Sequence, residues 1–155
     1  MRSEQNSVSN YERVLLAVDL TDESALVAGR AKALCERNGA ELHAVHVIEP
    51  LSLAYGGDIP MDISSVQDQI HEQAKRHLQE FTTRHGLSDT HSHLIFGRPD
   101  SEIQRLAAEL RADLIVVGSH GRHGLALLLG STANGVLHGA SCDVLAVRVG
   151  ENPEP

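Results

Sequence analysis

Short apolar segments alternate with longer, helix-like segments along almost the whole of this 155-residue chain. The apolar segments are rich in Val, Ile and Leu and are bounded by polar or turn-forming residues, which predicts buried strands. These predicted strands are 13–19, 40–50, 90–97, 113–118 and 143–149, and the helices between them are 21–39, 63–85, 98–112 and 131–138. Strict alternation of this kind predicts a doubly wound α/β fold, in which helices cover both faces of a parallel sheet.

The polarity of the strands predicts their order in the sheet. The first and fourth strands are the most apolar and belong in the interior, whereas the third carries His91 and His93 and suits an edge. With right-handed crossovers, the expected strand order is 3-2-1-4-5. The topological switch then lies between strands one and four, and ligands of such sheets bind at the carboxyl ends of the strands beside the switch.

The chain length fits one domain, expected over residues 11–149 with flexible tails at 1–10 and 150–155. The fifth strand would lie at an edge, yet its segment Val144–Val149 is almost wholly apolar. An exposed apolar edge invites pairing with another chain, and pairing about a two-fold axis satisfies both copies. We therefore predict a homodimer formed through this strand.

A glycine-rich run, "VVGSHGRHGLALLLGST", follows the fourth strand and leads into the last helix. Its four glycines are Gly118, Gly121, Gly124 and Gly130. Glycines, an anion nest of backbone N–H groups and a helix start together suit a phosphate cradle, to which Arg122 could add a charge. The run is neither a Walker A loop nor a dinucleotide fingerprint, so a plain flexible connection is the alternative.

Asp19 follows the first strand and lies across the predicted crevice from the glycine run. An Asp at this point often caps the next helix or begins a turn. Alternatively, its carboxylate accepts a hydrogen bond from a base or ribose.

Charge and cysteine content limit the partners and the compartment. The formal net charge of −8 disfavours nucleic acid and anionic membranes, and no apolar stretch approaches membrane-spanning length. Cys35 and Cys142 have no partner at metal-ligand spacing, which favours a reducing compartment. Because the first twelve residues are polar and do not resemble a signal peptide, we expect a cytoplasmic protein.

The ten histidines do not predict a metal site. His43 and His46 are three apart on a strand and face opposite sides. His91 and His93 share a face, but no carboxylate or cysteine stands near them in sequence. No nucleophile–base arrangement and no carboxylate pair is evident, so an enzyme is not expected, although slow ATP hydrolysis stays open.

Segments 13–50 and 113–149 together resemble the universal stress protein family, closest to short, single-domain bacterial members of the universal stress protein A type. The resemblance extends over about residues 11–149. It implies a Rossmann-like α/β domain, a cytoplasmic homodimer, a role in surviving stress, and ATP or AMP, with or without Mg²⁺, as the ligand.

Nucleotide-binding members of this family carry the pattern G-x2-G-x9-G-[ST]. Gly118 and Gly121 match its first part and Gly130-Ser131 its last, but eight residues rather than nine separate Gly121 from Gly130. The universal stress protein A branch, generally held not to bind ATP, has a shortened loop and lacks the glycines. The first hypothesis is therefore a protein that binds ATP or AMP. The second is a nucleotide-free protein that acts through protein–protein contacts, and the third is a weak ATPase or nucleotidyl transferase.

The resemblance also implies the site residues. The adenine contacts fall on Ala17, Val18 and Asp19 of the first strand and on Val47 of the second. The ribose and phosphate contacts fall on Gly118, His120, Gly121, Arg122, Gly130, Ser131 and Thr132.

Overall fold

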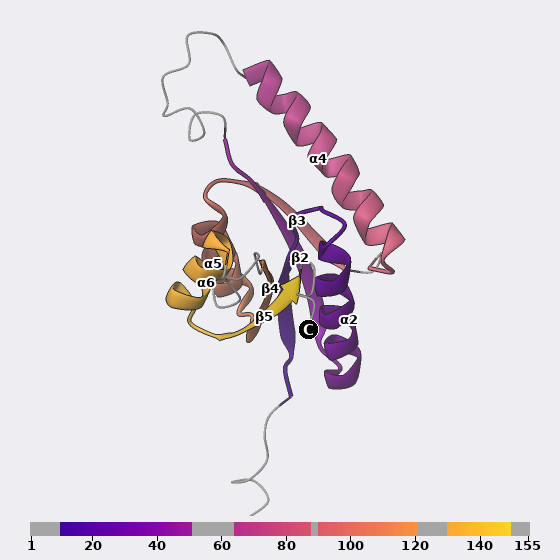
Figure 1. Ribbon diagram of the computed structural model, residues 1–155, viewed down its shortest axis with the longest axis vertical. Helices are drawn as coiled ribbons and strands as arrows, with labels where there is room; N and C mark the ends of the chain where they lie inside the picture. Colours follow the sequence, from indigo (N-terminus) through magenta and orange to yellow (C-terminus); the bar gives the residue numbers. More distant parts are fainter. Residues whose placement is uncertain (1–9, 51–63, 88–89, 121–129, 150–155) are drawn as a thin grey trace, which may run out of the picture.

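The fold is a five-stranded parallel sheet between two layers of helices (Figure 1). The computed structural model describes residues 10–50, 64–87, 90–120 and 130–149. The strands are β1 (Arg13–Ala17), β2 (Glu41–Ile48), β3 (His91–Phe96), β4 (Leu114–His120) and β5 (Asp143–Val149). The helices are α2 (Ser24–Asn38), α4 (Ser64–Arg84), α5 (Pro99–Leu110) and α6 (Ser131–Gly139). The order β3-β2-β1-β4-β5 confirms the predicted fold class and strand order.

Two apolar cores hold the layers together, one on each face of the sheet. Alternate residues of β1 supply them because successive side chains of a strand point to opposite faces. Val14 and Leu16 pack in the core under α2 and α4, whereas Leu15 packs in the core under α5 and α6. All three side chains are fully buried.

The helix ends agree with the sequence in part. α2 ends at Gly39, which has φ 66° and closes the helix in the left-handed conformation that glycine favours. α5 runs from Pro99 to Leu110, within the predicted 98–112, and its C-cap is Arg111, a non-glycine residue with φ 56°. No helix in the described part of the chain is both long and apolar enough to cross a bilayer.

Two predicted strand ends were wrong by two residues. β1 ends at Ala17 rather than Asp19, although the Val18 N–H still donates to the Val45 carbonyl at 2.8 Å. β4 continues past Gly118 to His120 because β5 pairs with it to its last residue, with His120 opposite Val149. Hydrogen bonding to the neighbouring strand decides where each strand ends. A local sequence pattern carries no information about that neighbour.

The side chain of Asp113, at the end of the α5–β4 turn, forms hydrogen bonds with the start of β1. Its two carboxylate oxygens accept hydrogen bonds from the backbone N–H groups of Glu12 and Arg13 at 2.9 and 3.0 Å. We expect Asp113→Ala to lower the free energy of unfolding by about 2 kcal/mol, since hydrogen bonds to a charged group are worth about 1.5–3 kcal/mol each and water replaces them in part. Urea denaturation measures this change.

Glu80→Ala on the exposed side of α4 is the control for Asp113→Ala, because it removes a carboxylate from a solvated position. We expect the control to change the stability by less than about 0.5 kcal/mol. Equal denaturation midpoints for the two variants would contradict the role assigned to Asp113.

Candidate functional site

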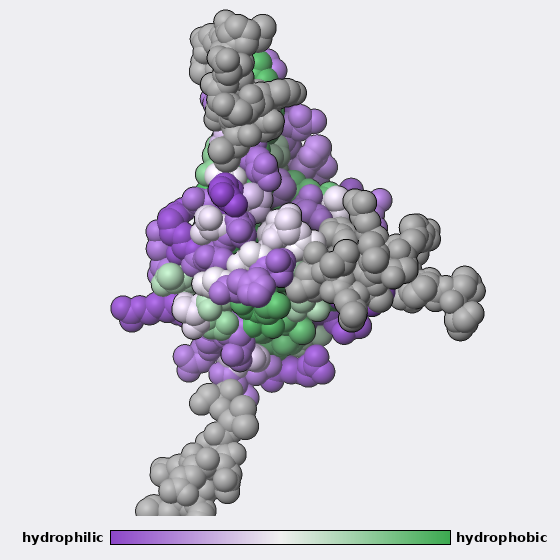
Figure 2. Space-filling model, turned by 60° about the vertical axis from the view of Figure 1, so that its left-hand side comes forward, coloured by the Kyte–Doolittle hydropathy of each residue, from purple (hydrophilic) through white to green (hydrophobic). Residues whose placement is uncertain are grey.

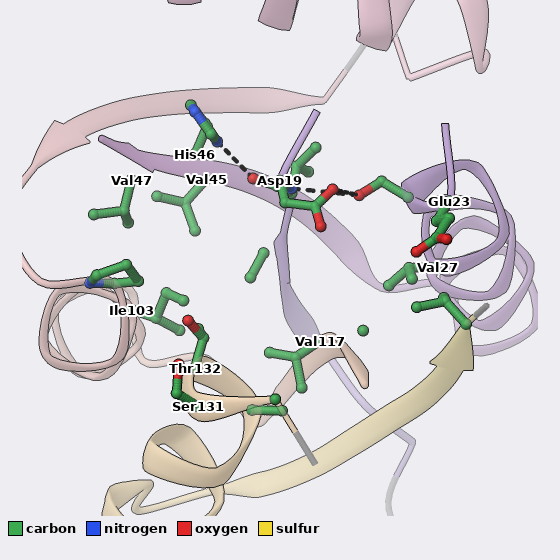
Figure 3. Close-up of a pocket in the computed structure, with 18 residues that line it drawn as sticks. Asp19, Glu23, Val27, Val45, His46, Val47, Ile103, Val117, Ser131 and Thr132 are labelled. Atoms are coloured by element: carbon green, nitrogen blue, oxygen red, sulfur yellow. Dashed lines mark hydrogen bonds between the residues drawn. The ribbon is translucent and has the colours of Figure 1, made fainter. Parts of the chain in front are cut away.

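A cavity of about 230 Å³ lies at the carboxyl ends of β1 and β4, where the strand order reverses (Figure 3). Side chains from β1, β2, β4, α2, α5 and α6 surround it. The predicted site residues that line this cavity are Ala17, Val18, Asp19, Val47, Gly118, Gly130, Ser131 and Thr132. Segments far apart in the sequence therefore meet at the point where a doubly wound sheet binds its ligands.

Of the remaining predicted site residues, the structure describes only the backbone of His120, which ends β4 opposite Val149. Gly121 and Arg122 lie outside the residues that the structure describes.

Asp19 organises the turn between β1 and α2. Its Oδ1 atom accepts hydrogen bonds from the Thr21 N–H at 3.0 Å, from the Thr21 hydroxyl at 2.6 Å, and from the Ser24 hydroxyl. The interpretation of Asp19 as a turn-forming residue is thus confirmed. The same residue lines the cavity, so a second role toward a ligand stays a prediction.

The side chain of His46 holds the end of β1 against β2. The Val18 carbonyl accepts a hydrogen bond from His46 Nδ1 at 2.7 Å, and Figure 3 shows His46 directed at this oxygen rather than across the cavity. Because a carbonyl can only accept, His46 carries its proton on Nδ1 in this contact. The strand end beside the cavity is therefore fixed before any ligand arrives.

Gly118 has a packing role that is independent of any ligand. A Cβ atom at this position would lie 3.1 Å from Cγ2 of Val27 on α2. The glycine lets α2 approach β4 closely, so this residue alone does not indicate phosphate binding.

The start of α6 faces the cavity through Gly130, Ser131 and Thr132. Gly130 is the N-cap residue with φ −63° and ψ 159°, and as a glycine it has no side chain that could cap the helix. The first backbone N–H groups of an α-helix lack intrahelical acceptors and carry partial positive charge. The first turn of α6 has no acidic residue to neutralise that charge, so this end of the cavity suits an anion.

Close packing against α5 sets the direction of α6. A Cβ at Gly135 would meet the Asp100 side chain, and one at Gly139 would meet Gln104. Gln104 Nε2 donates to the Gly135 carbonyl at 2.7 Å. These two glycines were not singled out in the sequence, because their importance depends on which helix lies beside them.

A second hollow of about 330 Å³ adjoins the start of α6. Ser131 and Thr132 line both hollows. The second one adds Arg98 together with the carboxylates of Glu49 and Asp100. A cation and two acidic groups thus lie next to the proposed anion-binding end of the first cavity.

Sequence reasoning missed most of the apolar wall of the cavity. This wall includes Val45 and Val117, which lie next to predicted residues, and Ile103 and Pro99 from α5. The remaining lining residues outside the prediction are Glu23, Ser24, Val27, His46, Ala133 and Val149. Helical periodicity places Ile103 on a buried face, but no local signal says that this face reaches the ends of β1 and β2.

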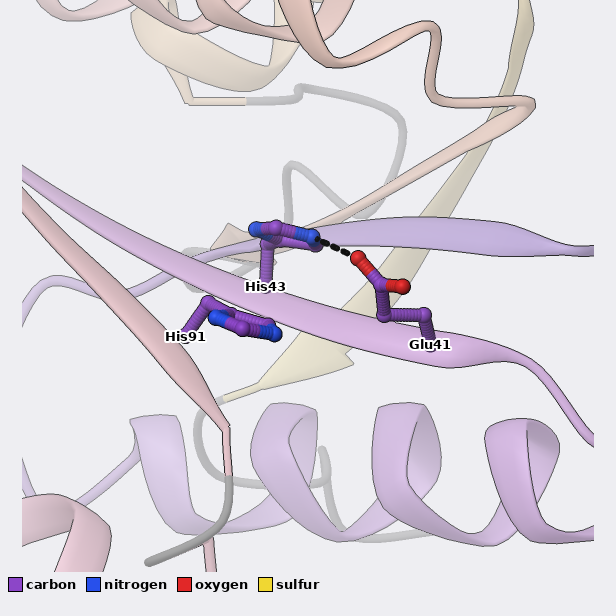
Figure 4. Close-up of side chains that lie close together, drawn as sticks. All are labelled: Glu41, His43 and His91. Carbon is purple, nitrogen blue, oxygen red and sulfur yellow. Dashed lines mark hydrogen bonds and ion pairs between the residues drawn. The ribbon is translucent and has the colours of Figure 1, made fainter.

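A separate polar cluster lies at the opposite, amino end of β2 and β3 (Figure 4). The parallel register places His43 beside His91, and Glu41 lies two residues before His43 on the same face. No carboxylate stands near His91 in the sequence, but in space Glu41 reaches it from the neighbouring strand. The pairing of β2 with β3 is what brings them together.

Two groups of this cluster have shifted pKa values. The hydrogen bond from His43 lowers the pKa of Glu41, with Arg13 adding to the effect. Burial lowers the pKa of His93, and the neighbouring His43 and His91 lower it further. His93 is therefore held in the neutral form.

The comparisons with known proteins agree with this fold. A sequence profile described as the universal stress protein family matches residues 10–148. Universal stress protein A homolog 2 of Coxiella burnetii is 42% identical, and the match covers 92% of this chain and 98% of that protein.

Solved structures have the same fold. The protein MJ0577, 23% identical, superimposes with a TM-score of 0.72 over 93% of this chain and 99% of its own. A universal stress protein solved in complex with cAMP is 25% identical, with a TM-score of 0.59 over 90% of this chain and 98% of its own. Together with the profile match over nearly the whole chain, these similarities show that the chain belongs to the universal stress protein family.

Proposed function

We propose that this chain binds an adenine nucleotide, ATP or AMP, in the cavity at the switch point and responds to stress through that occupancy. The observation that carries the proposal is that one cavity combines an apolar wall with an uncapped helix start. A relative solved in complex with cAMP supports the adenine nucleotide as the ligand class.

The base lies against the apolar wall of Val45, Val47 and Ile103, because a purine ring has large apolar faces. The carboxylate of Asp19 lies at the other side of the cavity and accepts a hydrogen bond from the base or the ribose. The phosphates lie at the start of α6, where the backbone N–H groups and the hydroxyls of Ser131 and Thr132 donate to them.

The outer phosphates extend into the second hollow, where Arg98 supplies a positive charge. Carboxylate oxygens are ligands that Mg²⁺ prefers, and Glu49 and Asp100 border the same hollow. Arg98 is 69% exposed and lies 3.9 Å from Asp100, so its guanidinium can turn toward a phosphate at little cost. This arrangement favours the magnesium complex of ATP over AMP.

We also propose that the chain forms a homodimer through β5. This strand is the last in the sheet, and no other strand of the described residues pairs with its outer edge. Leu145 on β5 is 37% exposed, and Leu137 on the neighbouring α6 is 47% exposed. Figure 2 brings this side of the molecule forward and shows a hydrophobic area on it. A second copy of β5 would cover the area and complete the edge.

The proposed role is binding rather than catalysis. The titratable residues that line the cavity are Asp19, Glu23 and His46. Asp19 accepts three hydrogen bonds, and His46 donates to a carbonyl. Both groups are thus engaged in holding the site, which leaves slow ATP hydrolysis as the most that we propose.

A reducing, cytoplasmic location completes the proposal. Cys35 and Cys142 are both free thiols. Burial raises the pKa of Cys35 to about 11, so the thiol is protonated and unreactive at neutral pH. Because neither cysteine forms a disulfide, neither requires an oxidising compartment.

Calorimetric titration of the purified chain with MgATP, after bound small molecules are stripped, tests the nucleotide proposal. We expect saturable binding with one site per chain. Absence of both heat and competition at millimolar ATP would overturn the proposal. The nucleotide-free alternative, which the short glycine spacing suggests, would then hold and the search would turn to protein partners.

A further inference from the structure

Three potential metal ligands converge at the amino ends of β2 and β3, away from the nucleotide cavity. Nε2 or Nδ1 of His43 and His91 and a carboxylate oxygen of Glu41 all lie within 4.8 Å of one another. Figure 4 shows Glu41 and His43 rising from β2, with the His91 ring from β3 alongside. Strands advance about 3.3 Å per residue, so His43 lies about 7 Å from Val45, the nearest residue of β2 that lines the cavity.

The spacing of the three donors is close to that of a metal site. In a tetrahedral site with bonds of about 2.0–2.2 Å, the donor atoms lie about 3.3–3.5 Å apart. His43 Nε2 is already 2.5 Å from Glu41 Oε1, and an ion would replace the proton between them. The His91 ring stacks on His43 with centroids 4.6 Å apart and must turn to ligate, which its exposed position allows.

His93 gives His43 the outer partner that a metal-bound imidazole needs. His43 Nδ1 lies 3.1 Å from His93 Nε2. A ligating histidine binds through one bare nitrogen, and its other N–H is normally held by an acceptor. In the empty site His43 Nε2 donates to Glu41, and the bare Nδ1 of His43 accepts from the His93 Nε2–H. When His43 Nε2 ligates, the proton of His43 is on Nδ1 and that of His93 is on its own Nδ1, so the bare His93 Nε2 accepts from His43. The pair fits both the empty and the occupied arrangement.

Arg13 lies beside the cluster and does not block it. Its Nε atom is 3.5 Å from Glu41 Oε1, while its Nη1 donates to the Leu110 carbonyl at 2.7 Å. Arg13 and His43 both contact Oε1, so Glu41 would ligate through Oε1 while the ion pair with Arg13 moves to Oε2. His43 is buried, whereas Glu41 and His91 are exposed, which leaves the site open to solvent on one side.

We propose that Glu41, His43 and His91 bind a divalent transition-metal ion of the Zn²⁺ class, with a fourth position open to water. Two imidazoles and one carboxylate suit Zn²⁺ and its neighbours in the first row, and not Mg²⁺ or Ca²⁺, which prefer oxygen ligands throughout. Three protein ligands with one open position is the arrangement of a reactive rather than a purely structural zinc site. None of these three ligands lines the nucleotide cavity.

Calorimetric titration of the full, EDTA-treated chain with Zn²⁺, in the absence of nucleotide, tests this site. We expect a stoichiometric site whose affinity falls more than about tenfold in His91→Gln and in Glu41→Gln, since loss of even an outer partner costs 10–100-fold. Both residues are exposed, so these variants should keep the fold, as circular dichroism can check. His77→Gln, an exposed histidine on α4, is the matched control and should bind Zn²⁺ as the parent does.

Two spectroscopic readouts separate this site from the other histidines. Co²⁺ bound by the parent should show the intense visible bands of a four-coordinate ion, and His91→Gln should lose them. The ¹⁵N resonance of His43 Nε2 should move on addition of Zn²⁺. Equal Zn²⁺ affinity in the parent, His91→Gln and Glu41→Gln, or an unmoved His43 resonance at saturation, would overturn the proposal.

Discussion

Replacing Gly130 by Val is expected to abolish MgATP binding at the switch-point cavity while leaving the fold intact. Gly130 is the N-cap residue of α6 and lines the cavity. Its φ of −63° and ψ of 159° are open to any residue, so Val causes no backbone strain. A branched side chain would instead occupy the space through which a phosphate approaches the helix start. Loss of one or two charge-assisted hydrogen bonds weakens binding by about 100-fold or more.

Calorimetry with MgATP measures this loss, and Gly29→Val is the matched control. Gly29 lies on the exposed side of α2, and a Cβ there would meet nothing within 4 Å. The control should bind MgATP as the parent does, and light scattering should find all three proteins with the same mass. If Gly130→Val binds as tightly as the parent, the phosphates do not lie at α6 and that assignment is wrong.

Leu145→Arg should convert the proposed dimer into monomers. Leu145 projects from the middle of β5, the edge strand, and is 37% exposed in the single chain. In a dimer formed edge to edge, two copies of this side chain would be buried near the two-fold axis. Two guanidinium groups there would lose hydration and repel each other. The pairing of the two β5 strands would not offset this cost in free energy. Light scattering after size-exclusion chromatography should find half the parent mass.

Val147 is a poorer position for the same test, although both residues lie on the predicted interface strand. Val147 is only 6% exposed and packs in the core under α2, so a charge there would unfold the chain. Leu26→Arg is the suitable control, because Leu26 is 47% exposed on α2 and lies off the edge strand. An unchanged mass for Leu145→Arg would contradict the interface, provided that Leu26→Arg also keeps the parent mass.

Local patterns predicted the elements of this protein well where the cause is local. Gly39 ends α2 and Pro99 begins α5, since the φ preferences of glycine and proline act within their own residue. Asp19 forms a turn as one of two predicted alternatives, because its partners Thr21 and Ser24 follow within five residues. Arg111 ends α5 in a left-handed conformation that favours glycine, and no residue type in the sequence signalled it.

The candidate cavity was predicted in outline and not in its walls. The order of the strands follows from their polarity, and the switch point follows from that order, so Asp19 and Gly130 could be assigned to one crevice. Ile103 reaches the same crevice only because α5 crosses over β1 and β2. Helical periodicity says which side of a helix is buried, but it does not say what that side covers.

The sequence by itself determined the alternation of strands and helices, the order of the sheet and the end of the sheet at which the candidate cavity lies. These follow from hydrophobic periodicity, which neighbouring residues encode together. Only the tertiary structure decided that His43 lies beside His91, that Glu41 joins them, and that α6 points its start at the cavity. Such contacts depend on strand register and helix packing, and these are set by the fit of whole surfaces rather than by any one segment.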